Sequence, residues 1–195
     1  GMFMGVPGLK VAVPATAADA KGLMTTAIRD DNPVVFFHHY LLTLEHGDVP
    51  DGEHAVPFGE AAVLREGGDV TIVAIGWCVG KALAAAEQLK SEGVNAEVID
   101  PRTLAPLDMG TILESVGKTG RLVVVDQSTR HGSAAAVIAA EAADEGFSAL
   151  KAPVKLVTAL DATVPYSEPM EEYLMPSEAR IVGAVHQVLG SSVVA

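Results

Sequence analysis

The chain has 195 residues, 49% of them hydrophobic and 19% charged, which is enough to bury the core of one domain or of one domain and a fragment. Its formal net charge of −12, from 13 Lys and Arg against 25 Asp and Glu, argues against binding to nucleic acid or to an anionic membrane. The single cysteine, Cys78, excludes an internal disulfide and a multi-cysteine zinc site, and because neither a signal peptide nor a membrane span is expected, we predict a cytoplasmic protein.

Short apolar segments of strand length alternate with helical segments along almost the whole chain. Near-continuous Val and Ile runs of this kind are typical of parallel strands that are buried on both faces. The expected strands are 11–13, 33–37, 70–75, 96–99, 122–126 and 154–158. The expected helices are 19–29, 79–92, 107–116, 133–150 and 177–189. This alternation predicts an α/β fold with a mainly parallel sheet.

A polar, turn-rich segment at residues 43–68 interrupts this rhythm, and we interpret it as a connector between two domains. Residues 1–42 hold about one βαβ unit, which has too few strands to close a core of its own and resembles the end of a domain whose beginning is absent. Residues 69–195 hold four expected strands and four helices, enough for an independent domain. The tail at 191–195 is expected to be frayed or docked on a partner.

The end of the first expected helix is a candidate cation site. Carbonyl groups at a helix C-terminus lack partners and carry the negative end of the helix dipole. Asp30 and Asn32 add side-chain oxygens there, so a monovalent or hard cation could be held. The same residues also make an ordinary helix stop before Pro33, so both interpretations stay open.

The segment 126–133 follows a buried strand and runs into a helix, which is where parallel α/β sheets usually place ligands. Arg130, His131 and the free N–H groups near Ser133 could hold an anion there. Ser133 is equally well explained as a helix cap and Arg130 as an interface residue.

Other candidate sites are weaker. Gly76 and Gly80 stand between a strand and a helix, but their spacing does not fit a dinucleotide-binding turn. His38 and His39 are adjacent at the end of an expected strand, so their side chains should point to opposite faces. Acidic and histidine side chains in the connector either form a loose metal site or a solvated loop; they are His46, Asp48, Asp51, Glu53 and His54.

Several motifs resemble one known family. The most specific are Ile99-Asp100-Pro101-Arg102-Thr103 and Val164-Pro165-Tyr166; the others lie at 7–11, 19–23, 27–30, 32–34, 59–61, 65–67, 69–71 and 106–108. Together they resemble the β subunit of thiamine diphosphate-dependent 2-oxo acid dehydrogenases of the pyruvate, branched-chain and acetoin types. The resemblance implies a three-layer α/β/α domain like the transketolase C-terminal domain at 69–195, preceded by the end of a pyrimidine-binding domain at 1–42.

The resemblance also implies a function and partners. The family carries out oxidative decarboxylation of a 2-oxo acid with acyl transfer to lipoamide, and its β subunits pair as homodimers and bind an α subunit and the dihydrolipoyl acyltransferase core. The α subunit or a fused domain holds the diphosphate and magnesium, and the glutamate that activates thiamine lies before the first residue of this chain. We therefore expect no catalytic residue here, an assembly role, and inactivity in isolation. A transketolase-like enzyme fragment and a non-catalytic interaction module remain alternatives.

One family site maps onto this chain residue by residue. The resemblance implies a potassium site in which Ala27, Ile28 and Asp30 act through the backbone and Asn32 is also a ligand, although the family site also draws on an earlier residue that is missing here. Two departures from the family pattern stand out. Residues 133–137 are Ser and Ala-rich where the family often has a glycine-rich turn and an early glutamate, and His38 replaces a commonly acidic residue, so docking of the α subunit there is expected to differ.

Overall fold

The computed structural model describes residues 1–190, and the expected behaviour of the tail at 191–195 lies outside the described residues. Its main sheet has five strands in the order β3-β5-β4-β7-β8. The strands β5 (Ala96–Asp100), β4 (Val70–Ala74), β7 (Leu122–Thr129) and β8 (Lys155–Ala159) are parallel, and only β3 (Ala62–Arg65), at one edge, is antiparallel to its neighbour. The predicted mainly parallel sheet is confirmed.

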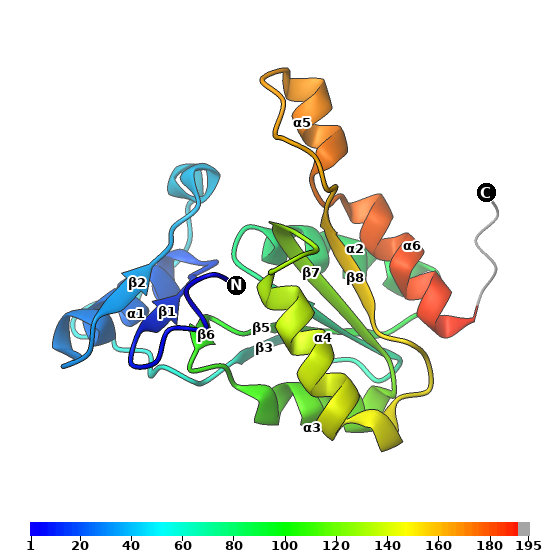
Figure 1. Ribbon diagram of the computed structural model, residues 1–195, viewed down its shortest axis with the longest axis horizontal. Coiled ribbons are helices and arrows are strands. Elements are labelled where there is room, and N and C mark those ends of the chain that lie inside the picture. Colours follow the sequence, from blue (N-terminus) through cyan, green and yellow to red (C-terminus); the bar gives the residue numbers. More distant parts are fainter. Residues whose placement is uncertain (191–195) are drawn as a thin grey trace.

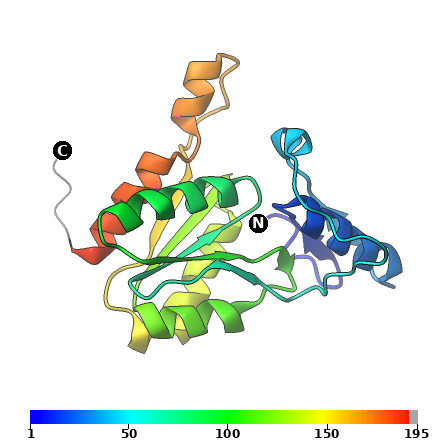
Figure 2. The ribbon, with the colours of Figure 1, turned by 180° about the vertical axis from the view of Figure 1, so that it is seen from behind.

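Helices cover both faces of this sheet (Figures 1 and 2). Helices α2 (Cys78–Ser91) and α6 (Glu178–Leu189) pack against each other over one face, and α3 (Met109–Thr119) and α4 (Ala134–Glu145) lie over the other. Three of these helices begin where a side chain caps the first turn, because Asp108, Ser133 and Ser177 each accept a hydrogen bond from a backbone N–H three residues later. The predicted three-layer α/β/α architecture is confirmed.

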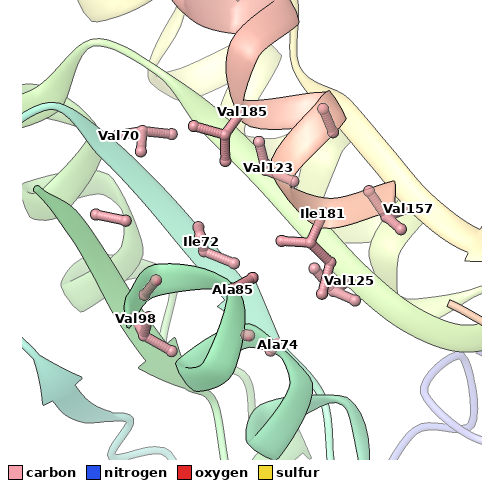
Figure 3. Close-up of a cluster of buried hydrophobic side chains, with 14 of the residues drawn as sticks. Val70, Ile72, Ala74, Ala85, Val98, Val123, Val125, Val157, Ile181 and Val185 are labelled. Carbon is pink, nitrogen blue, oxygen red and sulfur yellow. The ribbon is translucent and has the colours of Figure 1, made fainter. Parts of the chain in front are cut away.

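Alternate side chains of the central strands belong to two separate apolar cores, one on each face of the sheet. Val70, Ile72 and Ala74 of β4 face α2 and α6, where they meet Ile181 and Val185 (Figure 3). The intervening β4 side chain Val73 belongs to the second core, with side chains of α3 and α4. Because β4 and the first five residues of β7 are buried on both sides, their Val-rich composition follows from their position.

The N-terminal part forms the predicted βαβ unit. Strands β1 (Lys10–Ala12) and β2 (Val34–Phe36) are parallel and are connected by α1 (Ala17–Arg29). The unit is completed by β6 (Thr103–Ala105), which comes from the C-terminal part of the chain and pairs antiparallel with β1. Its own core is small, with Ala12, Leu23 and Val56 as buried members, so much of its packing depends on the rest of the molecule.

The structure contains short elements that the sequence did not predict. Strand β3 lies inside the expected connector, β6 has only three residues, and α5 (Glu168–Leu174) is a two-turn helix in a segment where the sequence pattern predicts neither helix nor strand. The helix expected to reach residue 150 ends at Glu145, because Gly146 stops it and a separate turn η2 (Phe147–Ala149) follows. Within residues 1–190 no helix combines the length and the apolar character needed to cross a bilayer.

Candidate functional site

Two cavities meet at the carboxyl edge of the parallel sheet, where α/β proteins commonly bind ligands. The larger has a volume of about 1060 Å³ and lies among α1, the turn η1 (Tyr40–Leu44) and the start of α2. The smaller, of about 650 Å³, lies over the ends of β4 and β7. Both are lined by His38, His39 and Trp77, so these side chains stand on the boundary between the N-terminal unit and the main sheet.

Trp77 organises this boundary. Its ring stacks on that of His39, with centroids 5.2 Å apart and planes 13° from parallel. The Lys81 ammonium, one turn into α2, lies 4.5 Å from the Trp77 ring centroid, within range of a cation–π interaction. Burial, and then the neighbouring charge of His38, lowers the pKa of His39 below its ordinary value, so the stacked imidazole is favoured in its neutral form.

The prediction that His38 and His39 point to opposite faces assumes strand geometry that the structure does not have at these residues. Strand β2 ends at Phe36, and residues 37–39 are irregular, so the alternation of a strand does not continue through them. Both residues line the same two cavities. The sequence pattern at this turn, with Gly76 and Gly80, does not predict the role of Trp77; the signal for it is a lone tryptophan at the end of a buried strand.

The three residues of the predicted anion site differ in burial and in their contacts. Ser133 is buried and caps α4, with its Oγ accepting from Ala136 N at 3.1 Å and donating to the Arg130 carbonyl at 3.0 Å. The Arg130 side chain is exposed, and His131 is also exposed, with its Nδ1 3.6 Å from Asp161 Oδ2. The backbone N–H of Ala135, in the first turn of α4, donates to Asp126 Oδ2 at 3.3 Å. It is therefore not free to bind an anion. This arrangement favours the helix-cap interpretation of Ser133.

The predicted cation segment brings its residues together around Asp30. The Asp30 carboxylate forms an ion pair with Lys10 and accepts from both the backbone N and the side-chain Nδ2 of Asn32, each at 2.9 Å. The hydrogen bond to Lys10 contributes most to lowering the pKa of Asp30 to about 2. The Ala27 carbonyl accepts from Asp30 N at 3.4 Å. A cation here would be bound chiefly by carbonyl groups, because the Asp30 carboxylate is paired with Lys10 and Asn32, whereas a carbonyl oxygen that accepts one hydrogen bond, as that of Ala27 does, keeps a second lone pair.

A buried carboxyl group, that of Asp100, lies between the two parts of the chain, and no motif in the sequence predicts its role. Asp100 ends β5 with no exposed surface, and burial is the largest cause that raises its pKa to about 7. One of its oxygens, Oδ2, has no hydrogen-bond partner. Arg102 follows with a φ of +58°, a conformation that a non-glycine residue rarely adopts, and its Nε lies 3.0 Å from Oδ1 of Asp19 in α1.

The described residues show little that could act as a nucleophile or hold a metal through side chains. Burial raises the pKa of the Cys78 thiol to about 12, so its reactive thiolate is strongly disfavoured at neutral pH. Across residues 1–190 there is no group of three or more His, Cys, Asp and Glu side chains placed to hold a metal ion. The acidic and histidine residues of the expected connector therefore do not form such a group.

Comparison with known families identifies the architecture. Residues 59–181 match the model of the transketolase C-terminal domain. The chain belongs to the transketolase C-terminal domain family. Residues 1–43 match the model of the transketolase pyrimidine-binding domain, so parts of the two domains follow each other in one chain.

The most informative relatives of this transketolase-family chain are β subunits. The β subunit of acetoin:2,6-dichlorophenolindophenol oxidoreductase from Cupriavidus necator is 47% identical over 188 residues, which are 96% of this chain and 56% of that subunit. The β subunit of the pyruvate dehydrogenase E1 component from Rickettsia bellii is 47% identical over 183 residues, 94% of this chain and 56% of the relative. The chain thus spans a little over half the length of these relatives.

Solved structures agree with this assignment. A split-gene transketolase described as an inactive β4 tetramer superposes with a TM-score of 0.82 at 29% identity, over 97% of this chain and 60% of the other. A transketolase from Pichia stipitis has a TM-score of 0.64 at 14% identity, over 97% of this chain and 26% of the other, and supports the fold alone. The predicted resemblance to 2-oxo acid dehydrogenase β subunits is confirmed as a family relationship.

Proposed function

We propose that this chain serves as an assembly section of the β subunit of a thiamine diphosphate-dependent enzyme that acts on a 2-oxo acid or on acetoin. Support comes from relatives that are β subunits of pyruvate dehydrogenase and acetoin oxidoreductase. The residues of the N-terminal unit correspond to a pyrimidine-binding domain, and the main sheet corresponds to the C-terminal domain. In this proposal residues 1–42 are the end of a pyrimidine-binding domain and residues 43–68 are a connector. Residues 69–195 form the assembly domain.

The observation that carries the assembly role is the set of large apolar side chains exposed near the carboxyl edge. Two segments project in the same direction from this side of the molecule, η1 and α5 (Figures 1 and 2). They expose Tyr40 and Leu44 on one segment and Tyr166, Met170 and Tyr173 on and beside the other. Exposed patches of this type mark interaction surfaces, and Tyr and Met are enriched in the energetic centres of interfaces.

Thiamine diphosphate and its magnesium ion do not fit the described residues alone. Residues 1–190 lack a side-chain cluster that could hold the metal. The carboxyl group whose pKa is raised to about 7, Asp100, lines neither cavity, so it is not placed to act on a cofactor bound there. In the proposed function the cofactor is bound by the complete enzyme, and this chain supports it indirectly and is inactive in isolation.

The proposal includes a potassium ion at the end of α1. The candidate ligands are the carbonyl groups of Ala27, Ile28 and Asp30, together with Asn32. The lowered pKa of Asp30 keeps a negative charge beside these carbonyl groups at any physiological pH, which favours a cation. Lys10 pairs with that carboxylate and offsets part of its charge.

The proposed partners are a second copy of the chain, an α subunit and a dihydrolipoyl acyltransferase core, in the cytoplasm. Self-association is supported by the related split-gene transketolase, which is described as a β4 tetramer. The net charge of −12 does not favour nucleic acid or an anionic membrane as a partner.

Reconstitution tests the proposal. The chain is combined with an α subunit and the N-terminal half of a β subunit from an acetoin or pyruvate enzyme, and substrate-dependent reduction of an artificial electron acceptor is measured. Activity is expected only when all parts are present, and it is lost when this chain is left out. A fully assembled complex, verified by light scattering, that shows no activity with acetoin or any 2-oxo acid would contradict the enzymatic part of the proposal.

A further inference from the structure

The segment 160–176 forms a projecting arm with a fixed root. We call it the α5 arm, because it contains α5 and the loop that leads to it from β8. At its root Arg180 donates to the carbonyl groups of Leu174, Met175 and Thr158, at 3.4, 3.0 and 2.6 Å. Leu160 N donates to the Leu174 carbonyl at 3.0 Å and the Leu174 side chain is buried. The arm is therefore held at a defined angle before it meets any partner.

The exposed part of the α5 arm is aromatic and acidic. Tyr166 is fully exposed, and Tyr173 retains 78% of its accessible surface. Four acidic side chains and no Lys, Arg or His lie in this segment; they are Asp161, Glu168, Glu171 and Glu172. A surface of this kind fits a basic recess with apolar walls, because the tyrosines supply buried area and the carboxylates supply charge.

The larger cavity could accept such an arm, because it combines lysine side chains with apolar walls. Basic groups from separate elements line it, Lys21 from α1 and Lys81 from α2, together with His38, His39 and His46. Its acidic lining residues are Glu45 and Glu178, so its two Lys and two Glu balance when His is neutral, and the cavity lacks the acidic excess of the whole chain. Its walls include Met24 and Ile28, which are 40% and 78% exposed in the single chain. The cavity thus offers basic groups and unburied apolar surface together.

We propose that the α5 arm of one copy of this chain docks into the larger cavity of a second copy, and that the second copy returns the same contact. The arm and the cavity are close on one molecule, because Glu178, two residues beyond the arm, lines the cavity. A two-fold axis between them generates two equivalent contacts, as in an isologous dimer. Two acidic arms cannot pair with each other without charge repulsion, which favours exchange over arm-to-arm contact.

This inference rests on the self-association proposed above and specifies the surfaces that produce it. Charge-reversal variants test the exchange of arms separately from self-association. One variant carries E168K, E171K and E172K on the arm, and a second carries K21E and K81E in the cavity. Size-exclusion chromatography with light scattering, at tens of micromolar, is expected to show dimers for the unmodified chain and an at least tenfold weaker association for each variant alone.

An equimolar mixture of the two variants is expected to restore dimers. In the mixed pair, the basic arm meets the acidic cavity and the unmodified acidic arm meets the unmodified basic cavity, so both contacts are complementary. A matched control carries E141K, D144K and E145K on α4, which reverses the same number of charges on another surface and should dimerise normally. Thermal unfolding by circular dichroism verifies that each variant is folded.

The outcomes distinguish the two proposals. If the unmodified chain dimerises and both reversal variants dimerise equally well, the exchange of arms is wrong while self-association stands. The same conclusion follows if each variant is monomeric but their mixture stays monomeric too. If the unmodified chain is monomeric, the proposed self-association is wrong and the exchange of arms falls with it.

Discussion

Arg102 and Asp19 connect the two parts of the chain, with Arg102 Nε 3.0 Å from Asp19 Oδ1. The contact is between charges and is not a well-aligned hydrogen bond, since Arg102 Nε has no hydrogen-bond partner. A second connection runs through the backbone, where Val13 N donates to the Arg102 carbonyl at 2.8 Å. The left-handed conformation of Arg102 directs the chain so that the residues after it, in β6, pair with β1.

Removal of the Arg102 side chain should destabilise the protein. In Arg102→Ala the buried Asp19 carboxylate loses its cationic partner, and we expect the free energy of unfolding to fall by about 2 kcal/mol, below the value for a fully buried pair because Arg102 is partly exposed. Urea unfolding measures this change. The control is Arg29→Ala, which removes the exposed, solvent-screened ion pair with Glu53 and should change the free energy of unfolding much less. Equal costs for the two variants would contradict this role of Arg102.

Asp100 should make stability fall as the pH rises. Its folded pKa of about 7 exceeds its ordinary value of 3.8, so between these values the native state binds more protons than the unfolded chain. The stabilisation is fully present below pH 3.8 and is lost as the pH rises through 7. Relative to Asp100→Asn, the unmodified chain should lose about 2 kcal/mol between pH 5 and pH 8. Parallel pH dependences of the two proteins would show that Asp100 is ionised in the native state.

The elements that could be predicted from the sequence depend on local patterns. The Val-rich strands and the cap at Ser133 are specified within a few neighbouring residues, and the structure contains them. The pairing of β6 with β1 joins segments about ninety residues apart, and the three residues of β6 carry no local pattern that predicts this pairing.

The candidate site was less predictable for the same reason. The prediction of opposite faces for His38 and His39 requires strand geometry beyond residue 37, whereas β2 ends at Phe36. The stack of His39 on Trp77 depends on two loops that meet only in the folded chain. The candidate cation segment at 27–32 can be predicted from the sequence because its residues are consecutive, so Asp30 and Asn32 lie close together in any fold.

Potassium should stabilise the folded chain if the end of α1 binds it. At a concentration ten times the dissociation constant, binding to the native state alone adds about 1.4 kcal/mol to the free energy of unfolding. Thermal unfolding in KCl is compared with choline chloride at equal ionic strength. Asn32→Ala should abolish the difference, while Asp31→Ala, at an exposed neighbouring position, should preserve it. Equal melting temperatures in the two salts at every concentration would argue against the site.

Fluorescence of Trp77 should report the protonation of His39. Trp77 is the single tryptophan of the chain, and its ring stacks on the His39 imidazole at 5.2 Å. A stacked imidazolium is expected to quench the indole, so the emission should fall as the pH is lowered. Because burial and His38 lower the pKa of His39, the midpoint should lie below the ordinary value of 6.5.

Two substitutions test whether His39 produces the fluorescence titration and whether His38 lowers the pKa of His39. His39→Ala should remove the titration altogether, because no imidazole then contacts the indole. His38→Ala removes the neighbouring positive charge, which is the second cause of the lowered pKa, and should move the midpoint upward without abolishing it. A titration that survives in His39→Ala would mean that another group controls the emission and that the stack does not form in solution. A midpoint above 6.5 in the unmodified chain would instead mean that a negative charge, and not burial, dominates the surroundings of His39.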